Sequence, residues 1–213
     1  MFISFEGVDG IGKTTMAKTL AGCINAECVT SDPKGTELGF NLTNEVIKSK
    51  KKVAPLTSAF TFLAARAQLV DEVIKPALEK NKTVICDRFM DSTIAYQGYL
   101  DKFVDMSLLK EMSLAASSGI IPDLTFLLVQ KDLNAIKTRI INRAKKNHED
   151  LDKYDGMSVE KMQVVQNGFL KIAENNHDRV KVIHVDGCTE MQVFHEIVYE
   201  FSQFVQLHSE LKY

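Results

Sequence analysis

Tryptophan is absent from this chain of 213 residues, and cysteine and proline occur only four times each. The cysteines, Cys23, Cys28, Cys86 and Cys188, show neither CxxC spacing nor the density of a disulfide scaffold, so we expect reduced thiols rather than disulfides or a metal site. The sequence also has no run of about 18 apolar residues, which excludes a typical membrane-spanning helix. What remains is an ordinary globular composition, with 45% apolar and 25% charged residues.

A strong charge of one sign is lacking as well, because 26 Lys and Arg face 28 Asp and Glu and leave a net charge of −2. The chain therefore has no overall field that would attract a nucleic-acid polymer or an anionic membrane, and we expect neither as a partner. Residues 1–10 contain no basic segment and reach an acidic residue at position 6, so we expect no secretory signal and a cytoplasmic protein. No repeat or proline-rich linker divides the sequence, and we expect a single domain over residues 1–213.

Short apolar runs rich in β-forming residues alternate with longer stretches of helical period along the chain. Five strands are expected, over residues 2–5, 28–30, 83–86, 124–129 and 180–185. None of them is joined to the next by a tight hairpin turn, and helix-like segments lie between them. This order is typical of an α/β fold in which helices cover both faces of a parallel sheet.

The pattern G-x-x-x-x-G-K-[ST] stands directly after the first expected strand, at residues 7–14. Its glycines let the backbone curl so that N–H groups face a concavity, and the helix that follows adds its positive end. Lys13 can reach the β- and γ-phosphates, and the hydroxyl of Thr14 can coordinate Mg²⁺. The pattern therefore predicts that ATP with Mg²⁺ binds at Gly7, Val8, Asp9, Gly10, Ile11, Gly12, Lys13, Thr14 and Thr15.

A second motif, VICDRFMDSTIAYQG, occupies residues 84–98. An apolar strand ends there at Asp87 and Arg88, and hydroxyl groups, Tyr96 and Gln97 follow at once. In an open α/β sheet ligands bind beyond the carboxyl ends of the strands, so this motif and the glycine loop could face one crevice. A phosphate loop alone does not distinguish transfer to water from transfer to a small molecule, and the second motif favours a small-molecule acceptor. A structural ion pair is the alternative for Asp87 and Arg88.

Five segments of the sequence resemble the thymidylate kinases of the bacterial type: FEGVDGIGKTT, SAFTFLAARAQ, CDRFMDSTIAYQG, PDLTFLL and LDKYD. The similarity covers nearly all of the chain and weakens after about residue 156. It implies the three-layer P-loop NTPase fold of nucleoside-monophosphate kinases, with a five-stranded parallel sheet and a short lid over about residues 139–156. It also implies Mg²⁺-dependent transfer of the γ-phosphoryl group from ATP to dTMP, which gives dTDP and ADP for dTTP synthesis, and assembly as a homodimer.

The resemblance also implies roles for individual residues. Phe62 stacks on the thymine ring and Arg66, one helical turn later, donates a hydrogen bond to the base; spacing of four residues places both on one helix face. Core packing is the alternative for Phe62. The remaining roles are the acceptor phosphate for Arg88, the base for Thr93 and Gln97, the sugar for Tyr96, the sugar or metal for Asp9, and Mg²⁺ for Thr14 and Asp87. A structural salt bridge is the alternative for Asp87.

The P-loop carries Ile11 where the eukaryotic type of the family has an arginine, so transition-state charge is expected to be met from the lid. Arg139 and Arg143 lie four residues apart on an expected helix, although arginines at this spacing are also common on a solvent-exposed face. Residues 147–155 likewise fit either a lid or a plain surface loop. The catalytic set that the resemblance implies is Lys13, Arg88, Asp9, Arg139 and Arg143.

The sequence departs from the family at the acceptor site. Ser31 and Thr43 stand where the family usually has arginines that clamp the acceptor phosphate, and the nearest cations are Lys34 and Lys48. A lysine supplies a point charge without the bidentate fork of arginine, so weaker acceptor binding is expected if either one substitutes. The family strand that ends in LLDV also reads LLVQ here, at residues 127–130. A broader deoxynucleoside-monophosphate kinase, a decayed kinase that retains nucleotide binding and an ATP-binding switch stay open as alternatives.

Overall fold

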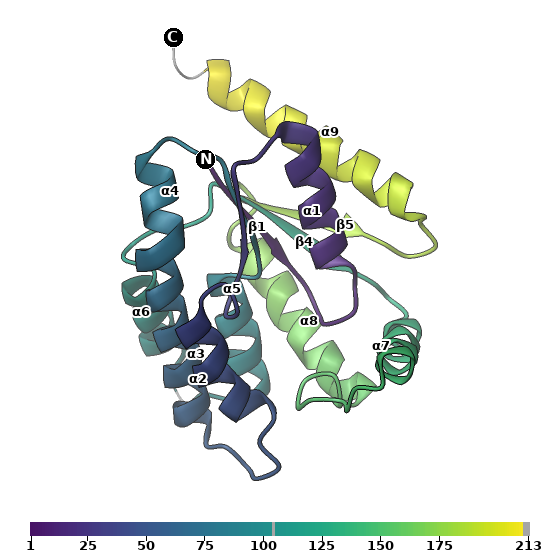
Figure 1. Cartoon of the computed structure of the whole chain (residues 1–213). Coiled ribbons are helices and arrows are strands. Elements are labelled where there is room, and N and C mark those ends of the chain that lie inside the picture. Colours follow the sequence, from purple (N-terminus) through teal and green to yellow (C-terminus); the bar gives the residue numbers. More distant parts are fainter. Residues whose placement is uncertain (104, 211–213) are drawn as a thin grey trace.

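A parallel sheet of five strands in the order β2-β3-β1-β4-β5 forms the centre of the computed structural model, which describes residues 1–103 and 105–210 (Figure 1). The strands are β1 (Phe2–Glu6), β2 (Cys28–Ser31), β3 (Val84–Asp87), β4 (Leu124–Val129) and β5 (Val180–His184). The five predicted strands and the α/β class are confirmed, with strand ends that shift by at most one residue. The expected single domain over residues 1–213 stays a prediction, because positions 104 and 211–213 lie outside the described residues.

Helices alternate with the strands along the chain, as the hydrophobic period predicts, and supply the crossover connections that parallel strands require. The α-helices are α1 (Lys13–Ile24), α2 (Glu37–Ile47), α3 (Pro55–Leu69), α4 (Lys75–Glu79), α5 (Met90–Thr93), α6 (Met106–Ala116), α7 (Leu133–Asn147), α8 (Val159–Glu174) and α9 (Glu190–Glu210). Two π-helical segments, η1 (Val70–Ile74) and η2 (Ile94–Leu100), continue α3 and α5. Within the described part of the chain no helix has the length and apolar character to span a membrane.

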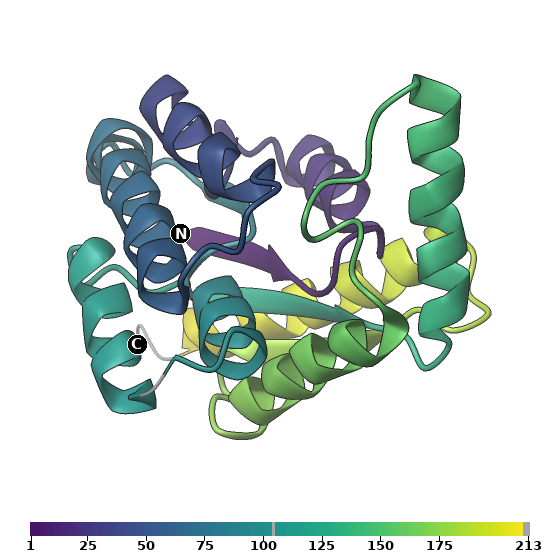
Figure 2. The same cartoon turned by 90° about the horizontal axis from the view of Figure 1, so that it is seen from below.

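The helices cover both faces of the sheet and give the structure three layers (Figure 2). On one face, α1 packs against β1 and β3, and α9 packs against α1 and β5. On the other face, α8 packs against β4, β5 and η2. The central strands are buried on both sides, because every residue of β1 and β4 is buried. Phe5 and Phe126 are 0% exposed, and their ring centroids lie 5.2 Å apart. Burial of both faces explains why the strands read as continuous apolar runs.

The register of the sheet brings the carboxyl ends of three strands together. Phe5 of β1 lies opposite Asp87 of β3, and Asp87 in turn lies opposite Ser31 of β2. The chain connects β1 to one edge strand, β2, while it connects its neighbour β4 to the other edge strand, β5. In open α/β sheets, ligands bind in the crevice outside such a switch point. The two sequence motifs therefore leave the sheet side by side, at the edge where a ligand is expected.

Candidate active site

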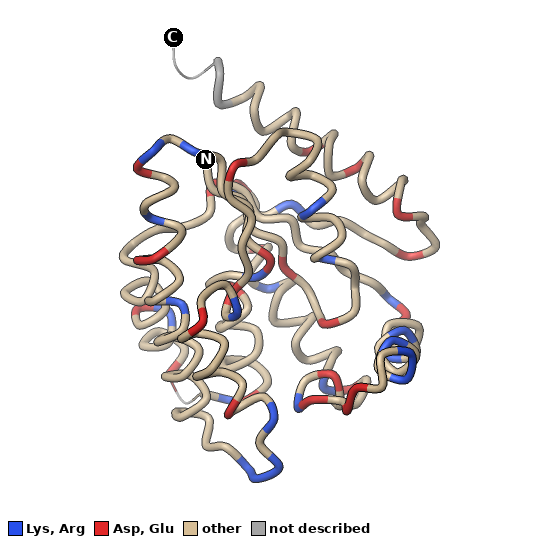
Figure 3. The backbone as a smooth tube through the Cα atoms, in the orientation of Figure 1, with Lys and Arg blue, Asp and Glu red and all other residues tan. Residues whose placement is uncertain are grey.

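A cavity of about 540 Å³ opens beyond the carboxyl ends of β1, β2 and β3. Its walls come from the loop after β1 and the start of α1, the loop after β2, the end of α2, α3, residues 87–97, and α7 with the segment after it. Lys and Arg gather on α7 and on the loop after α2, whereas Asp and Glu gather on the segment that follows α7 (Figure 3). A cavity of this volume suits a ligand of nucleotide size.

The loop between β1 and α1 has a backbone that glycine adopts readily and other residues do not. Gly7, Gly10 and Gly12 have φ values of +138°, +75° and +111°, and a Cβ on Gly7 would lie 2.6 Å from the carbonyl oxygen of Leu128. The loop runs directly into the N-terminus of α1, whose unpaired N–H groups form an anion site. Six of the nine predicted nucleotide-binding residues line the cavity: Asp9, Gly10, Gly12, Lys13, Thr14 and Thr15.

Lys13 and the two apolar residues of this loop have different surroundings. Val8 and Ile11 are buried in the hydrophobic core, so their backbone groups alone are available to a nucleotide. The ammonium group of Lys13 lines the cavity and donates a hydrogen bond of 2.8 Å to the carbonyl oxygen of Val8. Burial and the neighbouring Arg88 lower the pKa of Lys13 to about 8, against the attraction of Asp9. An anion in the cavity would favour the charged form of this amine.

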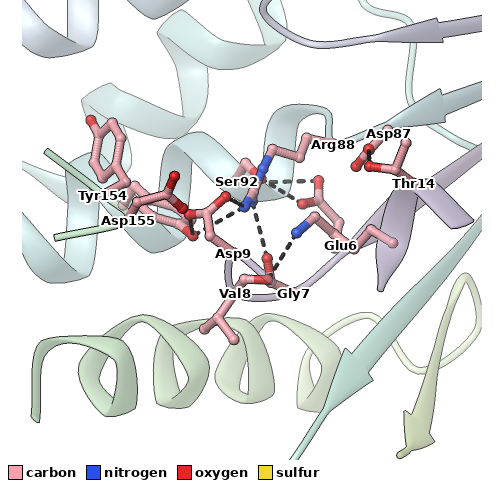
Figure 4. A network of polar contacts seen from close by, with 12 residues as sticks. Glu6, Gly7, Val8, Asp9, Thr14, Asp87, Arg88, Ser92, Tyr154 and Asp155 are labelled. Atoms are coloured by element: carbon pink, nitrogen blue, oxygen red, sulfur yellow. Dashed lines mark hydrogen bonds and ion pairs between the residues drawn. The ribbon is translucent and has the colours of Figure 1, made fainter. Parts of the chain in front are cut away.

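Thr14 and Asp87 meet where α1 begins and β3 ends (Figure 4). The hydroxyl of Thr14 donates a hydrogen bond to Oδ2 of Asp87, and Oδ1 of Asp87 is buried without a hydrogen-bond partner. Hydroxyl and carboxylate oxygens are ligands that Mg²⁺ prefers. Thr14 and Asp87 therefore fit an ion that takes two oxygen ligands from the protein. Among the described residues no group of three His, Cys, Asp or Glu could hold a metal ion.

Arg88 pairs with Asp9 across the cavity rather than with its neighbour Asp87. The guanidinium lies 2.6 Å from Oδ1 of Asp9 and donates a hydrogen bond of 3.2 Å to the hydroxyl of Tyr96, which donates one of 2.8 Å to Oδ2 of Asp9. Burial favours the protonated form of Asp9, but the charges of Arg88 and Lys13 outweigh it and hold the pKa of this carboxyl well below its ordinary value. The triangle therefore presents an oriented guanidinium to the cavity.

Phe62 and Arg66 both line the cavity from α3, as their spacing predicts. Arg66 is 1% exposed and forms a buried ion pair of 2.6 Å with Asp32. The other acceptors of its guanidinium are the hydroxyl of Ser113, the carbonyl oxygen of Phe89 and the hydroxyl of Thr93. Since four of its five N–H groups have protein acceptors, Arg66 mainly holds α3 in place. Its predicted hydrogen bond to a base stays a prediction.

Tyr154, in the segment between α7 and α8, completes an aromatic group that was not expected from the sequence. Its ring packs edge-on against Tyr96 at 5.1 Å and against Phe62 at 6.1 Å between centroids. Gln97 donates a hydrogen bond of 3.3 Å to its hydroxyl. The LDKYD segment entered the sequence analysis through its charge, its length and its resemblance to the family, and none of these gave Tyr154 a role; its single aromatic residue is the signal that could have placed it in the cavity.

The two lid arginines lie on α7 as predicted, but they have different surroundings. Arg143 lines the cavity, is 52% exposed at its side chain and pairs with Asp155 at 3.1 Å. Arg139 is not part of the lining and donates a hydrogen bond to the side-chain oxygen of Gln130. Gln130 also exchanges hydrogen bonds through its backbone with Gln166. Gln130 thus joins the end of β4 to α7 through its side-chain amide and to α8 through its backbone.

The positions that depart from the family are divided between the cavity and the protein interior. Ser31 and Lys34 line the cavity, and Lys34 is exposed. Thr43 is 0% exposed inside α2, where its hydroxyl donates a hydrogen bond of 2.8 Å to the carbonyl oxygen of Gly39. Lys48 ends α2 and is not part of the lining. Of the two candidate replacement lysines, Lys34 is therefore the one beside the cavity.

Comparison with known proteins agrees with this geometry. The family model for thymidylate kinase matches residues 5–197. The chain belongs to the thymidylate kinase family. This membership confirms the resemblance read from the sequence and the enzyme class, a nucleoside-monophosphate kinase.

Individual members of the family align over most of the chain. A thymidylate kinase of Maridesulfovibrio salexigens is 36% identical over 203 residues, which cover 92% of this chain and 93% of that protein. One from Prosthecochloris aestuarii is 35% identical over 210 residues, covering 94% and 92%. The crystal structure of thymidylate kinase from Ehrlichia chaffeensis is 31% identical, covers 95% of this chain and 98% of that chain, and has a TM-score of 0.74. The three-layer P-loop fold is thus shared with the family.

We expect the affinity for ATP to fall above about pH 8, because the pKa of Lys13 is lowered to about 8 and the amine loses its charge in the free protein above it. ATP binding then requires uptake of a proton, so Kd should rise by up to about tenfold per pH unit. Titration calorimetry between about pH 7 and pH 9.5, in buffers of different ionisation enthalpy, measures the Kd for ATP and the number of protons taken up on binding. Lys13→Arg keeps its charge in this range and should lack the slope. An equal slope in that variant contradicts the assignment to Lys13.

Proposed function

We propose that the chain is a thymidylate kinase, which transfers the γ-phosphoryl group of ATP to dTMP and forms dTDP and ADP. The observation that carries this proposal is that one cavity holds Lys13 of the P-loop together with Phe62, Arg88 and Tyr96. A phosphate-binding loop alone would serve a switch equally well. The aromatic rings beside this loop can stack on a flat base, and the guanidinium can bind its phosphate. A nucleotide-dependent switch does not require these groups.

The acceptor half of the cavity suits a pyrimidine deoxynucleotide in its chemistry. Phe62, beside Tyr154, supplies an aromatic surface for stacking on a base. Thr93 and Gln97 supply the hydroxyl and the amide that are proposed to contact the edge of the base. Tyr96, which bonds to Asp9, is the residue proposed for the sugar, where its ring disfavours a ribose 2′-hydroxyl. These assignments favour dTMP over a ribonucleotide.

We infer that Mg²⁺ accompanies ATP and is held by Thr14 and Asp87. Their oxygens lie together, and Oδ1 of Asp87 is buried without a partner. When bound there, the ion would supply positive charge that offsets the charge of the phosphates of ATP. Lys13 is the protein cation that we assign to the same phosphates, and the backbone of the glycine loop adds N–H donors.

The protein's own part in the reaction is positioning and charge, because transfer between two anions needs no covalent nucleophile. Arg88, already oriented by Asp9, is assigned to the acceptor phosphate. We propose that Arg143 meets the transferring group from a lid over about residues 139–156, since it lines the cavity and its exposed pair with Asp155 is easily exchanged. Arg139, bonded to Gln130, positions the lid helix.

Product formation tests the proposal directly. With Mg·ATP and dTMP, dUMP, dCMP, dAMP or dGMP offered separately, we expect chromatography to show conversion of dTMP above the others. Lys13→Ala should lower kcat on the order of 100-fold or more, because it removes one oriented donor to developing charge. Lys48→Ala, outside the cavity, is the control and should match the parent.

Three results contradict the proposal, and each identifies an alternative. Better turnover of another nucleotide indicates a broader deoxynucleoside-monophosphate kinase. Hydrolysis of ATP without phosphorylation of any acceptor indicates a switch, and binding of both nucleotides without turnover indicates a decayed kinase.

We also propose that Lys34 supplies the acceptor-phosphate charge that the family takes from arginines. It lines the cavity next to Ser31, on the loop that the sheet register places beside Asp87. The three arginines of the lining are each paired with a carboxylate, Arg66 with Asp32, Arg88 with Asp9 and Arg143 with Asp155. Lys34 is exposed in the same lining and forms no such pair with the residues that the structure describes, so it adds positive charge there.

Lys34→Ala should raise KM for dTMP about tenfold with a smaller change in kcat, because a point charge contributes to binding in the ground state and transition state alike. Steady-state kinetics at saturating ATP measures both constants. Lys48→Ala is the matched control, and Lys34→Arg should retain a KM near that of the parent. A larger effect from Lys48→Ala would assign the charge to the other lysine.

We propose that the chain forms a homodimer through α2, α3 and α6. Helix α3 packs against both α2 and α6, and these helices carry exposed large apolar side chains. They are Leu38, Phe40 and Leu42 on α2, Leu56 and Phe60 on α3, and Leu108 and Leu114 on α6. Exposed apolar surface of this kind marks interaction sites, and a second copy of the chain is the partner that the family resemblance implies.

Phe60→Asp should convert the dimer to a monomer, because it places a charge on a side chain that is 53% exposed in the single chain and buried in the proposed interface. Size-exclusion chromatography with light scattering measures the mass. Tyr199→Asp makes the same change at an aromatic residue of α9 that is 60% exposed, and should leave the dimer intact. A monomeric parent protein contradicts the proposal.

We infer that the protein acts in the cytoplasm, without a nucleic-acid or membrane partner. Its four cysteines are free, which suits a reducing compartment. Its net charge of −2 supplies no general attraction to polyanions.

A further inference from the structure

Glu6 has a buried carboxyl group to which the proposed reaction assigns no role. It ends β1, is 1% exposed and is not part of the cavity lining. Its Oε1 accepts hydrogen bonds from the backbone N–H groups of Phe89, at 2.8 Å, and Ser92, at 3.3 Å, and its Oε2 accepts one of 2.6 Å from the hydroxyl of Ser92. Glu6 therefore ties the central strand to the segment that follows β3 (Figure 4).

The turn that Glu6 holds has an uncommon backbone conformation. Arg88 has a φ of +69°, in the left-handed region that residues other than glycine adopt rarely and at a cost in energy. Such a conformation persists only when its surroundings enforce it. Phe89, the next residue, is 0% exposed, so its N–H group depends on Glu6 for an acceptor.

Arg88 donates hydrogen bonds to Phe5 of β1 and to Gly7 of the loop after it, and it reaches Glu6 through Ser92. Its backbone N–H donates a hydrogen bond of 2.9 Å to the carbonyl oxygen of Phe5, and its guanidinium donates one of 3.0 Å to that of Gly7. The same guanidinium nitrogen donates a hydrogen bond of 3.0 Å to the hydroxyl of Ser92, which donates to Glu6. Glu6 thus acts on both the backbone and the side chain of Arg88.

The environment of Glu6 disfavours a negative charge at this position. Burial and the nearby Asp91 raise the pKa of Glu6 to about 8, and the hydrogen bond from Ser92 opposes this rise. Arg179 forms its ion pair with Asp91, at 2.8 Å, and not with Glu6. A well-packed apolar side chain often stabilises a buried position at least as well as a buried ionisable group. What the carboxyl group supplies here is therefore its hydrogen-bonding oxygens, not a charge.

We propose that Glu6 is a positioning residue for Arg88, which holds the turn in its left-handed form through Phe89 and Ser92 and so aims the guanidinium into the acceptor half of the cavity. Glu6 itself contacts neither nucleotide. The inference rests on the proposed function in one respect, the assignment of Arg88 to the acceptor phosphate. The position of the Arg88 side chain can be measured without turnover.

Glu6→Met keeps the length of the side chain and removes both acceptor oxygens. We expect kcat/KM for dTMP to fall about 100-fold, because a displacement of about 1 Å at a positioning group costs this much. The affinity for a non-hydrolysable ATP analogue should change less than about twofold, since the P-loop keeps its own contacts. Glu6→Gln keeps one acceptor oxygen and should recover most of the loss.

Combination with Arg88→Ala separates positioning from a general structural role. If Glu6 acts through Arg88, Glu6→Met should change kcat/KM less than about twofold in the Arg88→Ala background. The same 100-fold loss in both backgrounds overturns the proposal. Asp91→Asn is the matched control, because it alters a neighbouring buried carboxylate that pairs with Arg179. It should lower the melting temperature, and any effect that it has on kcat/KM should be the same in the Arg88→Ala background.

Ser92→Ala provides a second route if Glu6→Met does not fold. It removes the hydroxyl between Glu6 and Arg88 and should cost about tenfold in kcat/KM, a loss that should also vanish in the Arg88→Ala background. Crystal structures of either variant test the geometry alone: a guanidinium displaced from Asp9 supports the proposal, and an unmoved one overturns it. A parent protein that forms no dTDP refutes the proposed function while the structural comparison still decides the role of Glu6.

Discussion

The parallel register between β1 and β3 is the constraint on which the rest of the site depends. It sets Phe5 opposite Asp87, so the glycine loop and the turn at Arg88 leave the sheet from adjacent positions. A shift of one residue would move every side chain of a strand to the opposite face. Asp87 would then no longer accept the hydrogen bond from Thr14, and Arg88 would no longer bond to the carbonyl oxygens of Phe5 and Gly7. The cavity is therefore a product of strand pairing before it is a product of its side chains.

The charges of the cavity differ in how firmly they are held. Arg66 and Asp32 have side chains that are 2% and 3% exposed, so their ion pair joins α3 to the loop after β2 and is not free to exchange with a ligand. Arg143 is 52% exposed, and water and salt weaken its pair with Asp155. This gradation places rigid charge on the sheet side and exchangeable charge on α7. The lid that we propose over about residues 139–156 would need that division to close on phosphates.

The motifs were readable from the sequence because each depends on local chemistry. Glycines before a lysine indicate a phosphate loop, and polar residues after an apolar strand indicate a ligand edge. The roles of Glu6 and Tyr154 were not predicted, because both depend on partners that are distant in the sequence. Glu6 bonds to residues 83 and 86 positions later. Tyr154 contacts Gln97 and Tyr96, which lie 57 and 58 positions before it. The same applies to Arg66, whose spacing indicates a shared helix face but whose guanidinium is largely occupied by protein acceptors.

Periodicity and spacing by themselves determined the five strands, the α/β class and the two motifs, because strand, helix and phosphate loop each follow from the order of neighbouring residues. Only the tertiary structure decided which of two equivalent side chains enters the cavity. Lys34 and Arg143 line it, whereas Lys48 ends a helix outside it and Arg139 is bonded to Gln130. Sequence order places residues on an element, but the direction in which an element faces is fixed by packing between segments that are distant in the chain.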